Sequence, residues 1–337
     1  KLWTSDEMPN TYKATIHDPT KMPSYEDRRA LEIMKASMRK EDDGSYVIRQ
    51  PWRQLPPKLP NNRGVALKRF EHLDRRFHND PNYFDEYKTA IEEYVNEGWA
   101  EVVPENELKK EDGSVHYVAH HGVRHPRKLS LRVVFDTSAK TNGKSLSNST
   151  YSGPDLLNSL VGVFVRFRVN KVAVMGDIRR FYHSIKIPKE DYDMYRYFWY
   201  KGGKLGEKII ELRLRVMLFG GVHSQSCAIL AVLDCLESAI KSGKLTKEDS
   251  DFLKRQLYSD DFLASFIDAD EAATIVLSMI DVFNESNFYI HKFVSNDQSF
   301  LQKIPPERRA PKAIGVPIGD EKTTALGVEW CPESDEI

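Results

Sequence analysis

Apolar residues recur every three or four positions in several stretches of the chain, and this spacing predicts amphipathic helices. The clearest apolar faces are Leu67, Phe70, Leu73 and Phe77, then Phe84, Tyr87, Ile91, Tyr94 and Val95, and finally Ile275, Met279 and Phe283. We also expect a helix capped by Ser24, a helix with Pro154 at its first position, and a long helix from about residue 223 to Gly243.

A period of two residues marks the strands. Between residues 209 and 217, Glu and Arg alternate with Leu and Val, which is the pattern of a half-buried strand. Another β-rich apolar run ends at Asp177, and two short β segments flank Asp260. The order of strands and helices after residue 171 predicts an α+β fold.

Length and composition limit the architecture and the function. The chain of 337 residues is long enough for two domains or one elaborate domain, and we expect the first 60 to form a peripheral extension and a proline-rich connector. With 40% hydrophobic and 29% charged residues, the chain is not disordered by composition. The net charge of -1 means that any nucleic-acid-binding surface must be local. No apolar run is long enough to span a membrane.

Two further features bear on the setting of the chain. It starts with K-L-W-T-S, without an initiator Met or an apolar signal core, so we expect it to begin inside a longer polypeptide. Its three cysteines form no Cys-x-x-Cys pair, which argues against a zinc site and favours a reducing compartment.

A local basic surface is predicted between residues 121 and 144. Six Lys and Arg residues there accompany one acid, Asp136, and an Asn-Gly pair predicts a hairpin turn. Two interpretations are open: the hairpin faces an anion, or it presents one solvated face.

The stretch Q-L-Y-S-D-D-F-L-A-S-F, residues 256 to 266, sets Asp260 and Asp261 side by side among apolar residues. A solvated hairpin turn is the simple explanation, because Asp is a common turn residue. If the strand ending at Asp177 lies beside this hairpin, three carboxylates converge at one sheet edge. That arrangement is costly without a cation, and oxygen ligands of this kind suit Mg²⁺. Two such ions can clamp the oxygens of a phosphoryl transfer.

Several blocks of sequence resemble one family in the same order. Y-S-D-D-F-L resembles the Tyr-x-Asp-Asp box of reverse transcriptases. L-R-V-V-F-D-T-S-A-K-T-N-G-K-S-L, G-P-D-L-L-N-S-L-V-G-V-F-V-R-F-R and K-V-A-V-M-G-D-I-R-R-F-Y-H-S-I resemble the BEL/Pao class of long-terminal-repeat retrotransposons, as do L-P-N-N-R and A-L-G-V-E-W. The resemblance runs from about Leu2 to Asp335.

The resemblance implies a right-hand polymerase with fingers and palm, the palm being an antiparallel sheet backed by helices. Residues 61–153 would be the fingers, 154–320 the palm with some interleaved finger segments, and 321–337 a primer-grip-like hairpin. Leu326, Gly327 and Trp330 match that hairpin. The thumb, RNase H and integrase would be further modules of the same polyprotein.

The resemblance also implies the chemistry. Asp177, Asp260 and Asp261 match the carboxylates that bind two Mg²⁺ or Mn²⁺ ions, and Lys292 matches a lysine that protonates or neutralises the leaving pyrophosphate. The 3′-hydroxyl of a primer annealed to an RNA or DNA template would attack the α-phosphate of a deoxynucleoside triphosphate (dNTP). A snorkelling surface lysine is the alternative for Lys292.

Five further positions match nucleotide-binding residues of the family. Arg132 and Lys128 would contact the triphosphate, Tyr182 would be the steric gate against ribonucleotides, and Phe219 and Gly220 would approach the incoming base pair. Core packing is the alternative for Tyr182, and a solvated side chain is the alternative for Lys128.

The chain also departs from the family. It has Ser224-Gln225 where Ser-Pro is usual, and Ser259 where Val is common, but it retains the three carboxylates. We therefore weigh an active polymerase against a non-catalytic, host-adopted module that binds nucleic acid or protein, and against a metal-dependent nuclease or nucleotidyl transferase. An intracellular location, in a cytoplasmic particle or the nucleus, is expected, with no membrane partner.

Overall fold

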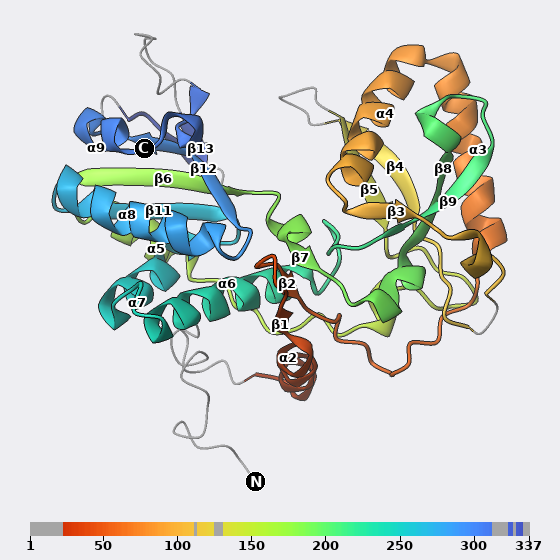
Figure 1. Cartoon of the computed structure of the whole chain (residues 1–337), viewed down its shortest axis with the longest axis horizontal. Helices are drawn as coiled ribbons and strands as arrows, with labels where there is room; N and C mark the ends of the chain where they lie inside the picture. The colour runs from red at the N-terminus through yellow and green to blue at the C-terminus, as the bar shows by residue number, and fades with distance from the viewer. Residues whose placement is uncertain (1–22, 111–112, 125–130, 312–322, 326–327, 333–337) are drawn as a thin grey trace.

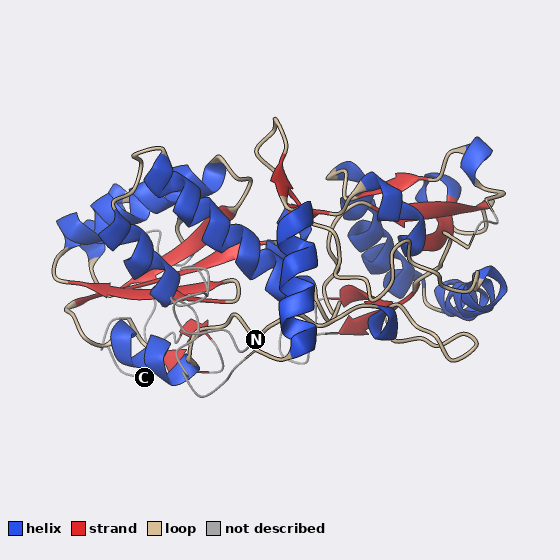
Figure 2. Ribbon diagram, turned by 90° about the horizontal axis from the view of Figure 1, so that it is seen from below, coloured by secondary structure: helices blue, strands red, loops and turns tan. Residues whose placement is uncertain are grey.

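The computed structural model describes residues 23–110, 113–124, 131–311, 323–325 and 328–332, which form two lobes joined by a narrower junction (Figure 1, Figure 2). The first lobe contains α3 (Arg63–Asn79), α4 (Pro81–Asn96), β3 (Ala100–Val102), β4 (Ala119–Arg124), β5 (Leu131–Asp136), β8 (Arg196–Tyr200) and β9 (Ile209–Leu214). The junction contains α2 (Tyr25–Ser37), β1 (Arg39–Lys40), β2 (Tyr46–Val47) and β7 (Ile185–Lys186).

The second lobe is built on one sheet. Its elements are α5 (Leu160–Phe167), β6 (Val172–Arg179), α6 (Ser224–Lys241), α7 (Lys247–Gln256), β10 (Leu257–Tyr258), β11 (Asp261–Phe266), α8 (Ala269–Asn284), β12 (Tyr289–Ser295), α9 (Gln298–Lys303), β13 (Thr323–Ala325) and β14 (Val328–Trp330). The sheet has the order β10-β11-β6-β12, and every neighbouring pair is antiparallel. The chain is thus mixed α/β with small, mostly antiparallel sheets, which agrees with the predicted α+β class.

Alternation along the strands gives this sheet two different faces. One face, which includes Ile178 and Phe262, is buried in the main hydrophobic core with residues of α6 and α8. On the other face, Met175 and Leu263 form a smaller core with residues of α5 and with Trp330 of β14. By the same alternation, Asp177 lies on this second face, near the end of β6 and beyond the smaller core.

Most predicted helices are present, and one begins elsewhere. The apolar faces predicted around Phe70, Phe84 and Met279 lie on α3, α4 and α8. The expected helix start at Pro154 is wrong, because α5 begins at Leu160 with Ser159 as its cap. The preceding segment has no regular secondary structure, and Asn158 donates from its side chain to the carbonyl oxygens of Lys254 and Leu257, each at 2.7 Å.

The prediction of a peripheral extension within the first 60 residues is wrong for α2 and β2. Ser24 caps α2 as expected, but the helix then buries Met34 completely, and Tyr46 is 2% exposed. Strand β2 pairs in parallel with β7, and Trp52 donates its indole N–H to Asp191 at 2.9 Å. The segment from α2 to Trp52 is therefore part of the packed junction.

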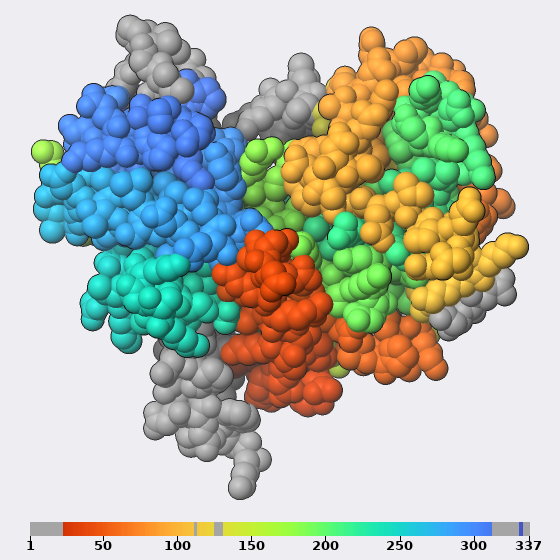
Figure 3. Space-filling view, viewed as in Figure 1, coloured from red at the N-terminus to blue at the C-terminus, as the bar shows by residue number. Residues whose placement is uncertain are grey.

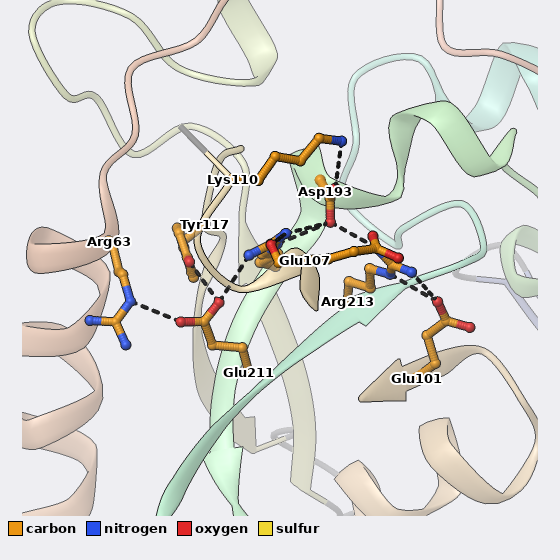
Figure 4. Close-up of polar contacts among 9 residues, drawn as sticks. Arg63, Glu101, Glu107, Lys110, Tyr117, Asp193, Glu211 and Arg213 are labelled. Carbon is orange, nitrogen blue, oxygen red and sulfur yellow. Dashed lines mark hydrogen bonds and ion pairs between the residues drawn. The ribbon is translucent and has the colours of Figure 1, made fainter. Parts of the chain in front are cut away.

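The predicted half-buried character of β9 is also wrong, because its polar face is buried as well. Glu211 and Arg213 are 5% and 3% exposed, covered by the segment before β4 and by α3. Figure 4 shows the result, a buried network of charges. In it, Arg196 contacts both Asp193 and Glu211, and Tyr117 donates its hydroxyl to Glu211 at 2.7 Å.

The chain leaves the second lobe after β6, passes through β7 in the junction, forms β8 and β9 in the first lobe, and returns to α6. The outgoing and returning strands meet at a narrow neck, where Lys186 and Val216 form a β-bridge. Met217 donates to Ile185 at 2.8 Å and Ile187 donates to Arg215 at 2.9 Å through the backbone. No helix within the described ranges is long and apolar enough to cross a membrane.

Candidate active site

The backbone register brings the three aspartates to one end of the second-lobe sheet. Asp177 and Asp261 are directly opposite each other in the β6–β11 pair. β10 and β11 form the predicted hairpin, with Ser259 and Asp260 in its turn. Ser259 adopts a left-handed φ of 56°, and the Asp260 carbonyl accepts from the Ile178 N–H at 2.7 Å. The turn is thus fastened to the strand that carries Asp177.

The electrostatics of the three carboxylates are coupled. Burial raises the pKa of Asp261 to about 7, and the charges of Asp260 and Asp177 add to the effect. Burial also raises the pKa of Asp260, with a further contribution from Asp177. For Asp177, burial is outweighed by a His291 hydrogen bond and by the charge of Lys292, so its pKa is lowered. Asp260 and Asp261 are therefore harder to ionise than a solvated aspartate, while Asp177 is easier to ionise.

Two residues of β12 supply the compensation that Asp177 receives. His291 is the register partner of Asp177, and its Nε2 lies 3.2 Å from Asp177 Oδ1. Lys292 Nζ lies 3.4 Å from the same oxygen. Both consecutive side chains reach Asp177 because β12 has an irregularity here and Lys292 has a left-handed φ of 54°. The sequence analysis identified Lys292 and missed His291.

The donor chemistry of this edge suits a hard divalent cation. Asp177, Asp260 and Asp261 offer carboxylate oxygens, and a cation would offset the burial and the mutual repulsion that raise the pKa values of Asp260 and Asp261. Within the part of the chain that the structure describes, no group of three or more His, Cys, Asp or Glu side chains is gathered closely enough to hold a metal ion. Mg²⁺ commonly uses one or two carboxylates together with substrate phosphates, so three gathered ligands are not required.

Tyr182 and Phe219, two of the predicted nucleotide-binding residues, lie beside the acidic turn. The half-buried Tyr182 ring packs edge-on against Phe219, with centroids 5.7 Å apart. Burial raises the pKa of Tyr182. A hydrogen bond with Ser259 lowers this pKa, and the charge of Asp260 raises it. Phe219 is 53% exposed. Gly220 has a φ of 87°, and an added Cβ would meet no atom within 4 Å, so its backbone conformation, rather than crowding, requires glycine in this structure.

The other predicted positions lie apart from this edge or outside the described residues. Arg132 is exposed on β5 of the first lobe, and Lys128 falls outside the described residues. Leu326 and Gly327 also fall outside them, within the predicted hairpin of β13 and β14. Trp330 is 2% exposed, and its ring packs against Phe167 of α5 with centroids 5.0 Å apart.

No family model matches the chain, and no curated protein matches it in sequence. The chemistry of the site therefore rests on its own residues, which are a set of interacting carboxylates at one end of the sheet, one neutralising lysine, and an aromatic pair beside the acidic turn.

Proposed function

We propose that the chain is the polymerase core of a reverse transcriptase of the BEL/Pao class, an RNA- and DNA-templated DNA polymerase. The register that sets Asp177 opposite Asp261, with Asp260 in the adjoining turn, carries the proposal. The antiparallel sheet backed by helices fits a palm, and the first lobe fits the fingers.

In this proposal Asp177 and Asp260 are the main ligands of Mg²⁺ or Mn²⁺, and Asp261 supports them. The two ions would activate the primer 3′-hydroxyl and stabilise the charge on the transferring phosphate. Lys292, which lies beside Asp177, would neutralise or protonate the departing pyrophosphate. Tyr182 would crowd a ribose 2′-hydroxyl and so favour deoxynucleotides.

The partners would be an RNA or DNA template with an annealed primer, and dNTPs. Arg132 lies on the β4–β5 hairpin of the first lobe, so it would reach the triphosphate when the two lobes close on a nucleotide. Its planar guanidinium suits bidentate binding of phosphate. The protein would act inside the cell, in a cytoplasmic particle or the nucleus.

Primer extension on poly(rA)/oligo(dT) with Mg²⁺ or Mn²⁺ tests the proposal. We expect extension by the wild type and a loss of at least about 100-fold in Asp260→Asn/Asp261→Asn, because the ions contribute several kcal/mol of charge stabilisation. Asp281→Asn, at an exposed position of α8, is the matched control and should extend normally. Equal extension by wild type and the double variant would show that these carboxylates are not catalytic.

The contacts of Asp177 favour a second candidate, a non-catalytic module that binds nucleic acid or protein. His291 and Lys292 satisfy Asp177 within the chain itself, without a cation. Calorimetric titration with a dNTP separates the two functions. A polymerase core should bind the dNTP more tightly with Mg²⁺ than with EDTA, and Asp177→Ala should lose that gain. If the wild type binds the dNTP equally tightly with Mg²⁺ and with EDTA, the result supports the second candidate.

A further inference from the structure

A cavity of about 450 Å³ lies at the junction of the two lobes. In the space-filling view the surface is hollowed between the lobes, beside the yellow-green segment that follows β6 (Figure 3). Four cationic side chains line the cavity: Arg179, Arg180, Lys186 and Arg215. Its volume is in the range of pockets that hold small-molecule ligands.

Two of the four cations are neutralised by partners of their own. Arg180 forms an ion pair with Glu93. Lys186 lies 2.7 Å from carboxylate oxygens of both Glu41 and Asp43, and its hydrogen bond holds the pKa of Asp43 down at about 2. Asp43 therefore stays ionised and is occupied by Lys186, although it lines the cavity.

The other two cations, Arg179 and Arg215, have N–H donors without an acceptor among the described residues. Arg179 is exposed and has no ion pair with any described residue. Arg215 Nε is shielded from solvent without a hydrogen-bond acceptor in the described part of the chain. Its ion-pair partner, Glu101 Oε2, is 3.7 Å away, and Glu101 also contacts Arg213 at 2.7 Å. A hydrogen bond to Tyr192 raises the pKa of Arg215, so the guanidinium stays charged. The Arg215 side chain is 38% exposed, so N–H groups other than the shielded Nε can donate to an anion in the cavity.

His183 also lines the cavity, but it adds no positive charge. The His183 ring stacks on Trp99 with centroids 4.7 Å apart, and its Nε2 lies 3.1 Å from the Tyr94 hydroxyl. Burial and the nearby Arg180 lower the pKa of His183 to about 3, so the imidazole is neutral. Glu97, at the rim, is exposed to solvent and its charge is screened there.

The cavity is next to the candidate active site but does not share its carboxylates. Arg179 follows Asp177 by two residues on β6 and pairs in register with Tyr289, which also lines the cavity. Two residues along a strand correspond to roughly 7 Å. Asp177, Asp260 and Asp261 are not among the residues that line the cavity.

We propose that this cavity binds a polyphosphate through Arg179 and Arg215, in a site that needs no divalent cation. Two guanidinium groups with unsatisfied donors suit the several negative oxygens of a diphosphate or triphosphate better than a single carboxylate. Such a group has two natural sources beside a polymerase centre, inorganic pyrophosphate and the tail of a nucleoside triphosphate. The binding itself stands independently of polymerase activity.

Isothermal titration calorimetry in EDTA tests the inference, with inorganic phosphate, pyrophosphate, triphosphate and dATP as probes. We expect pyrophosphate and triphosphate to bind, and phosphate to bind at least about tenfold more weakly because it engages fewer donors. Asp177→Asn/Asp260→Asn should retain this binding. Tighter binding of dATP than of triphosphate would identify a nucleotide as the ligand, and equal binding would identify inorganic polyphosphate.

Matched arginine variants place the binding in the cavity. Arg179→Gln and Arg215→Gln should each weaken pyrophosphate binding by about tenfold or more, since each removes a charge-assisted contact. Arg28→Gln, at an exposed position of α2, should leave it unchanged. The exposed position of Arg179 keeps the test valid if the Arg215 variant fails to fold. Absence of pyrophosphate binding, or an equal effect of all three variants, would overturn the inference.

Discussion

His291 lies directly opposite Asp177 in the β6–β12 pair, with 3.2 Å between His291 Nε2 and Asp177 Oδ1. Lys292, the next residue, reaches the same oxygen at 3.4 Å. Asp177 is thus the one member of the acidic trio described here whose pKa is lowered, while those of Asp260 and Asp261 are raised. His291 and Lys292 thus compensate the charge of Asp177 in the absence of a bound cation.

His291→Ala should lower the free energy of unfolding in EDTA by about 1 kcal/mol, because Asp177 loses a hydrogen bond while its acidic neighbours remain. Added Mg²⁺ should then stabilise the variant more than the wild type, since the cation replaces a lost compensating contact. Melting temperatures with EDTA and with Mg²⁺ measure both effects. His121→Ala, an exposed histidine of β4, is the control. If Mg²⁺ raised the melting temperature of His291→Ala no more than that of the wild type, the prediction would be contradicted.

Arg196→Met should destabilise the first lobe by about 3–5 kcal/mol, the usual cost of removing one partner from a buried ion pair. Arg196 is fully buried, and its loss leaves Asp193 and Glu211 with less compensation. Arg63→Met also removes a contact of Glu211, but the Arg63 side chain is 52% exposed and its loss should cost less than about 1 kcal/mol. Urea unfolding compares the two variants, and equal midpoints would count against this account of the network.

Tyr182→Val should reduce the preference for dNTPs over ribonucleotides by at least about tenfold if the ring is a steric gate. Tyr182→Phe keeps the ring and should keep the preference. Single-nucleotide incorporation assays with paired dNTP and ribonucleotide substrates measure the ratio. If Tyr182 only packs against Phe219, the valine variant will lose stability and rate while the ratio stays constant.

Stability should fall as the pH drops below 6.5, in part because of His120. Burial lowers the pKa of His120 from 6.5 to about 4, and its neutral ring bridges Tyr87 and the Phe198 carbonyl. The unfolded chain takes up this proton first, so acid favours unfolding between pH 6.5 and about 4.

Urea unfolding at pH 7.5 and pH 5 measures this effect. The wild type should lose about 2 kcal/mol more than His120→Phe between the two conditions, at about 1.4 kcal/mol per pH unit below the pKa of the unfolded chain. His183 and His223 act with the same sign, because burial lowers both their pKa values to about 3, but they remain in both proteins. Equal losses in wild type and variant would exclude His120 as a cause.

Local patterns were enough to predict the acidic hairpin. An apolar run on each side of a turn-forming pair gave β10 and β11, and the β-rich run before Asp177 gave β6. The sequence did not show whether β6 lies beside this hairpin, because that pairing joins segments about eighty residues apart along the chain. The register that sets Asp177 opposite Asp261 required the structure.

The errors have physical causes outside the local pattern. His291 was missed because alternation allows only one of two consecutive residues on a face, and the irregular backbone at Lys292 is not encoded by a recognisable turn sequence. The polar side of β9 resembled a solvated face, yet other segments of the first lobe bury it and pair its charges. Burial of a strand's second face depends on what packs there, which the strand's own residues do not reveal.

The neck between Lys186 and Val216 has a consequence for how this protein can change. Because the outgoing and returning strands are joined by backbone hydrogen bonds, the segment between them is a closed excursion from the second lobe. The turn between β8 and β9 can therefore change in length while the neck keeps the entry and the exit of this segment together. β8 and β9 themselves carry Arg196, Glu211 and Arg213 of the buried network, so the rest of the first lobe restricts how far these strands can vary.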